Sequence, residues 1–312
     1  MSSTNLININ HALLELKFGK PIILKNNDGT LLLVAASEFI SDKTIDLMKD
    51  LSGSNPTITI TKERYSLINN MPSDHKYFSI SNERLDSDLC HQLSYKVNIS
   101  KETIKNLNVF SENNNHITNK MIALLKYGKI IPSFLRCDFS NEFYEDVFDK
   151  TKEDKLFTLD LMDIEIFQKK KKEVNLMVEA DVPLKSNKSV KVLGFRPTDG
   201  SSDHFAFVFN NGKNEEKPYV RIHSQCITGD LFHSLKCDCG SQLDEAINFL
   251  SDKNGMILYM SQEGRDIGFL NKMRAYSYQE TGLNTIEANH AIGFDSDQRN
   301  FEYASSILKS LN

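Results

Sequence analysis

Short apolar runs separated by polar connections fill the first 140 residues, a pattern typical of strands joined by turns and short helices. The apolar runs 21–24 and 31–34 flank a polar turn that contains Gly29, which predicts two consecutive strands. Ser41 is placed to cap a helix. These patterns predict strands at 21–24, 31–34 and 57–60, helices at 42–49 and from Thr61, and an exposed loop in the Asn-rich stretch 111–119.

The second half of the chain alternates strands and helices more clearly. Leu243, Ala246, Ile247 and Leu250 recur at helical spacing, and Gly255 supplies a stop. The alternation predicts a mixed α/β (α+β) chain with two domains, each a sheet packed with helices. The expected elements are strands at 190–195, 204–209, 219–222 and 256–260, a strand-like stretch at 287–294, a glycine-containing loop at 262–268, and helices at 270–280 and from Phe301.

Composition limits the class of protein. The chain has 312 residues, which favours two domains, and it is 40% hydrophobic and 25% charged, as is ordinary for a globular protein. The formal net charge of -5 gives no broad electrostatic footprint for nucleic acid, so we expect no nucleic-acid partner. No apolar stretch is long enough to span a membrane, and the N-terminus does not resemble an export signal. We therefore expect no membrane association and a cytoplasmic location.

A charged stretch separates the two halves. It covers residues 141–175 and includes the run Lys169–Lys172. Lysine runs are usually solvated surface, and we interpret this one as the hinge between domains. The predicted organisation is a first domain at 1–140, a charged linker at 141–175 and a second domain at 176–312.

Three of the five cysteines cluster, with the spacing C-x10-C-x-C at Cys226, Cys237 and Cys239. Thiolates suit a tetrahedral zinc ion, and a site with three protein ligands keeps one position open for water, as in catalytic zinc sites. Gly240 would permit a sharp turn after the cysteine pair. Two alternatives stay open: three thiols without a metal, or a closed structural site completed by His223 or His233. The remaining cysteines, Cys90 and Cys137, are expected to be small buried apolar residues.

Two acid–arginine pairs are candidates for chemistry on a phosphorylated substrate. Asp297 with Arg299 could act as a proton shuttle and a phosphate ligand, and Glu263 with Arg265 flanks the flexible Gly264. Each pair, taken alone, is more often a surface ion pair. Arg221 precedes the first cysteine and could bring a positive charge beside the metal.

In combination, these segments closely resemble GTP cyclohydrolase II. The resemblance runs from about Val178 to the last residue. It rests on residues 221–230, 234–240, 262–268, 271–276 and 285–289.

The resemblance implies the chemistry. Cys226, Cys237 and Cys239 would hold one zinc ion per chain, which activates water for attack on C8 of guanine, so that the ring opens and formate leaves. Arg299 would attack the α-phosphate and displace pyrophosphate, with Asp297 as general acid and base, and Tyr276 would serve ring opening. The implied GTP contacts are Arg221, Ile222, His223, Ser224, Gln225, Gln242, Glu263, Gly264, Arg265 and Thr285.

The resemblance also implies the setting of the reaction. Mg²⁺ would accompany the GTP triphosphate, and the pyrimidine product, 2,5-diamino-6-(5-phosphoribosylamino)pyrimidin-4-one, would enter riboflavin biosynthesis. A homodimer is the expected assembly.

The first domain is similar to 3,4-dihydroxy-2-butanone-4-phosphate synthase, which is often fused ahead of the cyclohydrolase. The similarity lies in residues 12–20, 34–48 and 57–64, and residues 161–183 resemble the junction of such fusions. The synthase uses an acidic metal-binding loop, whereas residues 25–30 here contain one carboxylate, Asp28. A hard dication needs several oxygen ligands. Residues 128–132 also lack the expected histidine, so we expect this domain to fold without catalysing the ancestral reaction.

Two departures concern the second domain. Gln225 replaces the usual Glu beside the first cysteine, and the chain ends at Asn312, before the strand and the Thr/Lys loop with which family members continue. We therefore expect weaker GTP binding. The rival hypothesis is a catalytically impaired, truncated homologue that acts as a zinc-binding or partner subunit. A purely structural zinc module is a third.

Overall fold

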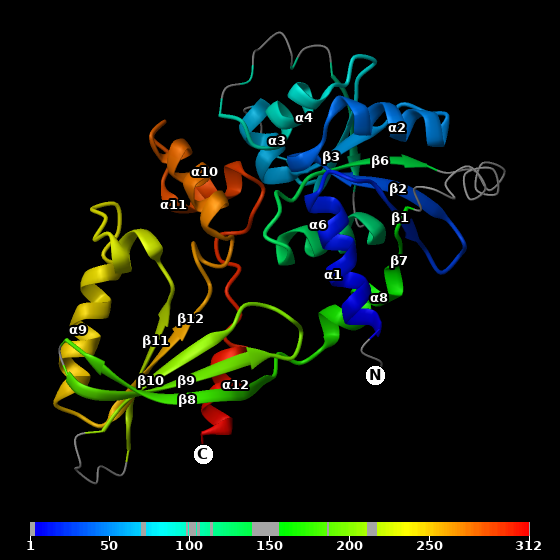
Figure 1. The fold of residues 1–312 in the computed structure, drawn as a ribbon. Coiled ribbons are helices and arrows are strands. Elements are labelled where there is room, and N and C mark those ends of the chain that lie inside the picture. The colour runs from blue at the N-terminus through cyan, green and yellow to red at the C-terminus, as the bar shows by residue number, and fades with distance from the viewer. Residues whose placement is uncertain are drawn as a thin grey trace. The chain divides into compact units, whose positions relative to one another are not determined.

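The chain folds into two compact units, which we describe separately. The computed structural model describes residues 4–69, 73–97, 99, 104, 107–112, 115–138, 156–185, 187–210 and 217–311. The first unit comprises residues 1–170 and 270–296, and the second comprises residues 171–269 and 297–312 (Figure 1). A segment from the cyclohydrolase-like half thus belongs to the unit formed by the N-terminal half.

A seven-stranded sheet forms the centre of the first unit. Its neighbouring strands pair antiparallel, except that the edge strand β7 runs parallel to β1. In sheet order the strands are β5 (Asn108–Glu112), β4 (Tyr77–Ser81), β3 (Thr57–Thr61), β6 (Phe134–Asp138), β2 (Leu31–Ala36), β1 (Ile22–Lys25) and β7 (Thr158–Asp160).

Both faces of this sheet are buried under helices, which explains why all six residues of β2 are apolar and buried. Leu32 and Val34 join the core on one face, and Leu31 and Leu33 join the core on the other. The first face packs against α1 (Thr4–Lys17), α6 (His116–Tyr127) and α8 (Leu161–Lys169), and the second against α2 (Asp42–Ser52), α3 (Lys62–Asn69) and α4 (Ser87–Ser94), with the short η1 (Ser37–Phe39) after β2.

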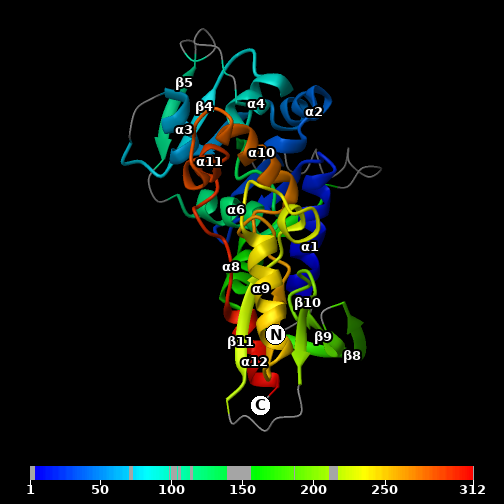
Figure 2. The ribbon, with the colours of Figure 1, turned by 90° about the vertical axis from the view of Figure 1, so that its left-hand side faces the viewer.

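Two helices from the C-terminal half complete the first unit. They are α10 (Phe269–Gln279) and α11 (Thr285–Ala291), and α11 lies beside α3 (Figures 1 and 2). The predicted strand at 287–294 is wrong, because a capping box starts a helix there. The Asn284 side chain accepts from the Glu287 backbone N–H, and the Glu287 carboxylate accepts from the Asn284 backbone N–H.

The loop predicted at 111–119 is also wrong for the residues that the structure describes. Strand β5 extends to Glu112, and α6 begins at His116 because the Asn115 side chain accepts from the backbone N–H groups of Ile117 and Thr118. The asparagine that suggested a loop is therefore a helix cap.

The second unit is a five-stranded sheet between two helices. Its order is β11 (Tyr219–Ser224), β12 (Gly255–Met260), β10 (His204–Phe209), β9 (Asn187–Pro197) and β8 (Val174–Leu184), and only the β11–β12 pair among these is parallel. Leu258 packs with Ile307 of α12 (Glu302–Ser310) on one face, and Ile257 packs with Leu250 of α9 (Cys239–Ser251) on the other. The predicted mixed α/β class with two helix-packed sheets is confirmed.

Most of the predicted elements are present within a few residues of their expected bounds, including the strands at 21–24, 31–34 and 57–60 and the Ser41-capped helix. Cys90 and Cys137 are buried as expected. None of the described helices is both long enough and apolar enough to cross a membrane.

The chain passes from one unit to the other inside the lysine run, between Lys170 and Lys171. Lys172 is not a solvated residue, because its Nζ lies 2.8 Å from the carboxylate of buried Asp199. Part of the predicted linker, residues 141–155, lies outside the described residues, and the division at residues 140 and 175 stays a prediction.

Gly19 should be intolerant of alanine for two separable reasons. Its φ of 72° favours glycine, and an added Cβ would lie 2.4 Å from the Phe39 carbonyl oxygen. Gly29 shares the positive φ, 85°, but has open space around it. We expect Gly29→Ala to cost about 1 kcal/mol of unfolding free energy and Gly19→Ala about 2–4 kcal/mol, because the backbone must also move. Urea unfolding followed by circular dichroism tests this; equal losses for the two variants would show that the Phe39 contact is unimportant.

Candidate active site

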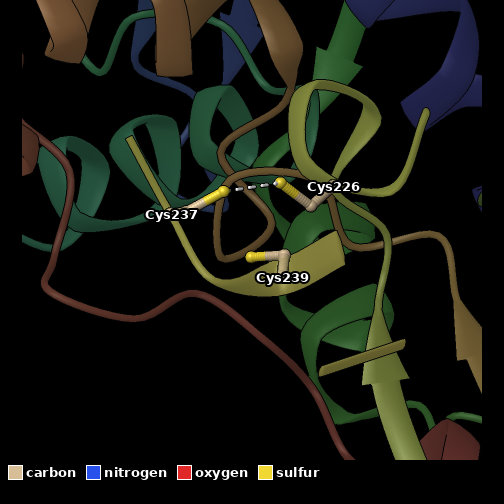
Figure 3. A group of neighbouring side chains, drawn as sticks. All are labelled: Cys226, Cys237 and Cys239. Atoms are coloured by element: carbon tan, nitrogen blue, oxygen red, sulfur yellow. Dashed lines mark hydrogen bonds between the residues drawn. The ribbon is translucent and has the colours of Figure 1, made fainter. Parts of the chain in front are cut away.

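The three clustered cysteines converge at one end of the second sheet (Figure 3). Cys226 follows β11 and precedes η2, a single π-helical turn (Ile227–Leu231), while Cys239 is the first residue of α9. Their sulfur atoms all lie within 4.8 Å of one another, and the Sγ atoms of Cys226 and Cys237 are 3.6 Å apart. Two sulfur ligands of a tetrahedral zinc ion lie about 3.8 Å apart, given a zinc–sulfur distance of about 2.3 Å. The three thiols could therefore hold a metal ion.

No fourth side chain of the described residues joins this group. Neither a histidine nor a carboxylate in that part of the chain lies close enough to all three sulfur atoms. His223, one of the two candidates for a fourth ligand, is buried, and its Nε2 lies 3.1 Å from Asp230 Oδ1. The geometry therefore favours a three-ligand site over the closed alternative.

Gly229 makes room for the sulfur atoms. An added Cβ there would lie 2.8 Å from the Cβ of Cys239, 3.0 Å from the Sγ of Cys237 and 3.1 Å from the Sγ of Cys226. Gly240 has a related role, since its added Cβ would lie 2.3 Å from the Gly229 carbonyl oxygen. We expected Gly240 to allow a sharp turn, but it lies in the first turn of α9 and instead permits the close approach of η2.

Asp230 holds the backbone of the first cysteine. Its Oδ2 accepts from the Cys226 backbone N–H at 2.9 Å and from the Tyr259 hydroxyl at 2.8 Å, and the Tyr259 ring stacks on His223. Glu263 fixes the next residue of this segment, because its Oε2 accepts from the Ile227 backbone N–H at 2.7 Å. Tyr259 was missed in the sequence, since a tyrosine inside an apolar strand carries no sign that its hydroxyl reaches a metal loop.

Burial and the neighbouring Cys237 and Cys226 thiols raise the pKa of Cys239. Without a metal, this group therefore keeps its proton at neutral pH. A metal ion that binds here must displace that proton, so its affinity should rise with pH.

The predicted substrate residues of the second unit lie on β11 or directly after it, on α9 and in the loop after β12. The Arg221 guanidinium donates to the Gln242 side chain at 2.9 Å, and Gln242 donates to Asp238 at 2.7 Å, which links β11 to α9. Arg221, Ile222 and Gln242 are exposed, His223 and Glu263 are buried, and Ser224, Gln225, Gly264 and Arg265 are half-buried.

The loop after β12 has an unusual backbone. Gly264, Arg265 and Asp266 all have positive φ values, 64°, 60° and 70°. The left-handed region costs non-glycine residues conformational energy, and such residues concentrate at functional sites. The Arg265 carbonyl accepts from the Gln298 backbone N–H at 3.0 Å, which ties this loop to the Asp297–Arg299 segment.

Asp297 and Arg299 form a close ion pair. The Arg299 Nε donates to the Asp297 Oδ1 at 3.0 Å, and its Nη2 donates to Oδ2 at 2.6 Å. These hydrogen bonds lower the pKa of Asp297 and raise the pKa of Arg299. Asp297 is thus a carboxylate and Arg299 a guanidinium cation at neutral pH.

Tyr276 and Thr285 belong to the other compact unit. Tyr276 lies on α10, where the Lys272 Nζ is 5.6 Å from its ring centroid, and Thr285 begins α11 and accepts from the Gln279 side chain at 3.0 Å. Their roles toward GTP stay predictions.

Comparisons with known proteins place the chain among riboflavin enzymes. A family model described as GTP cyclohydrolase II matches residues 175–312. A GTP cyclohydrolase-2 of Aliivibrio fischeri (strain MJ11) is 47% identical over 140 residues, which cover 45% of this chain and 70% of that protein. The riboflavin biosynthesis protein RibBA of Staphylococcus aureus (strain COL) is 31% identical over 345 residues, which cover 98% of this chain and 86% of that protein.

A solved structure of RibBX, a two-domain 3,4-dihydroxy-2-butanone 4-phosphate synthase from A. baumannii, covers 94% of this chain and 95% of its own, with 13% identity and a TM-score of 0.39.

Gly229→Ala should weaken metal binding, because the new methyl group would push the three sulfur atoms apart. We expect at least a tenfold loss of Co²⁺ affinity, a typical effect of disturbing the surroundings of metal ligands. Titration followed by the thiolate-to-cobalt absorption band measures it. Ser251→Ala, at the far end of α9, is the matched control; equal affinities for the two variants would show that Gly229 does not shape the site.

Proposed function

Since the chain belongs to the GTP cyclohydrolase II family, we propose that it hydrolyses GTP to 2,5-diamino-6-(5-phosphoribosylamino)pyrimidin-4-one, formate and pyrophosphate in riboflavin biosynthesis. The observation that supports this most directly is the group of three sulfur atoms with no fourth ligand among the described residues. Structural zinc sites are closed by four protein ligands, whereas catalytic sites keep one position open.

We propose zinc as the metal of Cys226, Cys237 and Cys239, one ion per chain. Soft thiolates favour zinc over Mg²⁺, and the observed sulfur spacing suits a tetrahedral ion. Zinc, when bound, would supply an activated water for opening the imidazole ring and releasing formate. Mg²⁺ would accompany the triphosphate, and a homodimer is the assembly we expect.

The chain's own residues would divide the remaining work. We assign the exposed Arg221 and Gln242 and the strained loop at Glu263–Arg265 to holding GTP, where fixed donors and a positive charge suit a triphosphate. Tyr276 would serve the ring-opening stage.

Asp297 and Arg299 would act at the α-phosphate. In this step a guanidinium nitrogen of Arg299 attacks the α-phosphorus, the bond to the pyrophosphate oxygen breaks, and the N–H proton passes to Asp297. The Arg299–Asp297 hydrogen bonds support this assignment, because they already place the carboxylate against the N–H groups of the guanidinium. The shifted pKa values of the free pair keep the proton on Arg299. The transfer therefore follows phosphorus–nitrogen bond formation, which makes the substituted guanidinium more acidic. Hydrolysis of the phosphorus–nitrogen bond then frees the nucleotide.

Removing one sulfur ligand should abolish formate release. We expect Cys239→Ser to lose bound zinc and to release formate at least 100-fold more slowly, since zinc is needed to activate water. Cys137→Ala, which alters a buried cysteine in the other unit, should keep both properties. Metal analysis and a formate assay with GTP and Mg²⁺ measure the effect. Folded, zinc-loaded wild-type protein that releases no formate would refute the proposed activity and favour a non-catalytic zinc protein.

Changes at the Asp297–Arg299 ion pair should slow pyrophosphate release without loss of zinc. Arg299→Ala and Asp297→Asn leave the three thiols untouched, so zinc content should equal that of the wild type. Pyrophosphate release should fall by at least 100-fold, because the nucleophile or its base is lost. A coupled pyrophosphate assay with metal analysis on the same samples tests this. Unchanged pyrophosphate release would leave the pair as an ordinary surface salt bridge.

A further inference from the structure

Helix α10 lies within the segment matched to the cyclohydrolase family, yet it packs in the unit built by the N-terminal half. The side chains of Asn271, Arg274 and Tyr278 hydrogen-bond to that half. Their spacing of three and four residues puts them on one face of the helix. Their partners come from four separate places in the N-terminal half.

The most deeply buried of these partners is Arg64 on α3, which is 1% exposed. Its guanidinium donates to five neutral oxygens: the Tyr278 hydroxyl and the backbone carbonyls of Ala291, Leu93, Gln92 and Lys96. Ala291 ends α11 and Tyr278 lies on α10, so the single side chain of Arg64 binds both of these helices. The Tyr278 hydroxyl in turn donates to the carbonyl of Lys96 at 2.7 Å. A buried charge held by this many oriented acceptors fixes its surroundings, because any displacement leaves a desolvated group unpaired.

A second buried charge holds the other end of the contact face. The Glu38 carboxylate accepts from the Ile131 backbone N–H and from the Arg274 guanidinium, both at 2.7 Å. Arg274 also lies over the Tyr95 ring, with its Cζ 4.8 Å from the ring centroid. One turn earlier, the Asn271 amide donates to the Lys129 carbonyl at 2.8 Å. Lys129 has a φ of 57°, so the backbone that receives this bond is itself in a rare conformation.

The contact face sets the direction of Tyr276. Successive residues of an α-helix are turned by about 100°, which places Tyr276 roughly 170° around the axis from the middle of the Asn271, Arg274 and Tyr278 face. Tyr276 therefore lies on the side of α10 opposite this contact face, with the Lys272 Nζ over its ring. Rotation of α10 would move Tyr276 and would break the contacts of Arg64 and Glu38 at the same time.

We propose that Arg64 and Glu38 are positioning residues. Through them the N-terminal half fixes the position and rotation of α10, and thereby the orientation of Tyr276. The role of Tyr276 in ring opening rests on the proposed function. The inference that the N-terminal half fixes α10 rests only on the contacts of Arg64 and Glu38 described above. In this arrangement the N-terminal half contributes to the reaction without carrying out chemistry of its own.

The test compares Arg64→Met with Arg84→Met, a matched change of an exposed arginine on the same half. Hydrogen–deuterium exchange of peptides from α10 measures how firmly this helix is fixed. We expect about tenfold faster exchange in Arg64→Met and no change in Arg84→Met. Tyr278→Phe, which removes one hydroxyl, and Glu38→Gln, which keeps the side-chain volume, should show the same direction. These milder variants decide the question if Arg64→Met does not fold.

Product ratios supply the second measurement. Formate and pyrophosphate are assayed in the same reaction, and we expect the formate yield per pyrophosphate to fall at least threefold in Tyr278→Phe, as in Tyr276→Phe. A general loss of folded protein would lower both products equally and leave the ratio unchanged. Arg64→Lys, which keeps the charge, should lie between the wild type and Arg64→Met.

The outcomes separate the two hypotheses. Unchanged α10 exchange in Tyr278→Phe and Glu38→Gln, or an unchanged product ratio in an active enzyme, overturns the positioning role. If the wild-type protein releases neither product, the proposed function fails, and the exchange data alone then decide whether Arg64 and Glu38 hold α10.

Discussion

The close approach of two backbone segments, the π-helical turn after β11 and the first turn of α9, is the constraint on which the site depends. Gly229 and Gly240 face each other there, and a Cβ on either would collide with backbone or sulfur atoms. The approach brings a cysteine that follows a strand beside two cysteines at a helix start, eleven and thirteen residues later. Without it, the three thiols would be too far apart to share an ion. Asp230 and Glu263 then stabilise the turn by accepting backbone N–H groups that would otherwise be unpaired.

A charged side chain that hydrogen-bonds to backbone groups also occurs in the first unit, where the charge is positive. There the buried Arg64 donates to carbonyl oxygens at the ends of helices, where orphan acceptors are available. In both units a buried ionised side chain pairs with backbone groups and so fixes where a loop or helix lies. Such a group costs desolvation free energy unless every bond is made, and that cost makes the surrounding geometry specific.

The sequence predicted the sheet strands and the cysteine group because both follow local rules. Alternating apolar residues give strands such as β2, and thiol spacing gives a metal site. The errors at residues 111–119 and 287–294 both overlooked a helix cap. Asn115 belongs to the Asn-rich stretch that suggested a loop, but it caps α6, and Asn284 caps α11 where a strand was expected. The membership of α10 in the first unit was not predictable, because the acceptors of Arg64 are mostly main-chain carbonyls. Main-chain groups are present at every residue and leave no trace in the sequence.

Retention of the N-terminal sheet has a physical rationale if the N-terminal half supports α10. Taking it away would leave the Arg274 guanidinium, the Tyr278 hydroxyl and the Asn271 amide without the partners that now satisfy them. Tyr278 is buried, so the loss would expose an apolar ring as well as free its hydroxyl. The dependence is mutual, because Arg64 would lose the Tyr278 hydroxyl and the Ala291 carbonyl and keep a desolvated charge with fewer acceptors. The N-terminal half can therefore be required for the fold of the segment that carries Tyr276, whatever chemistry it performs itself.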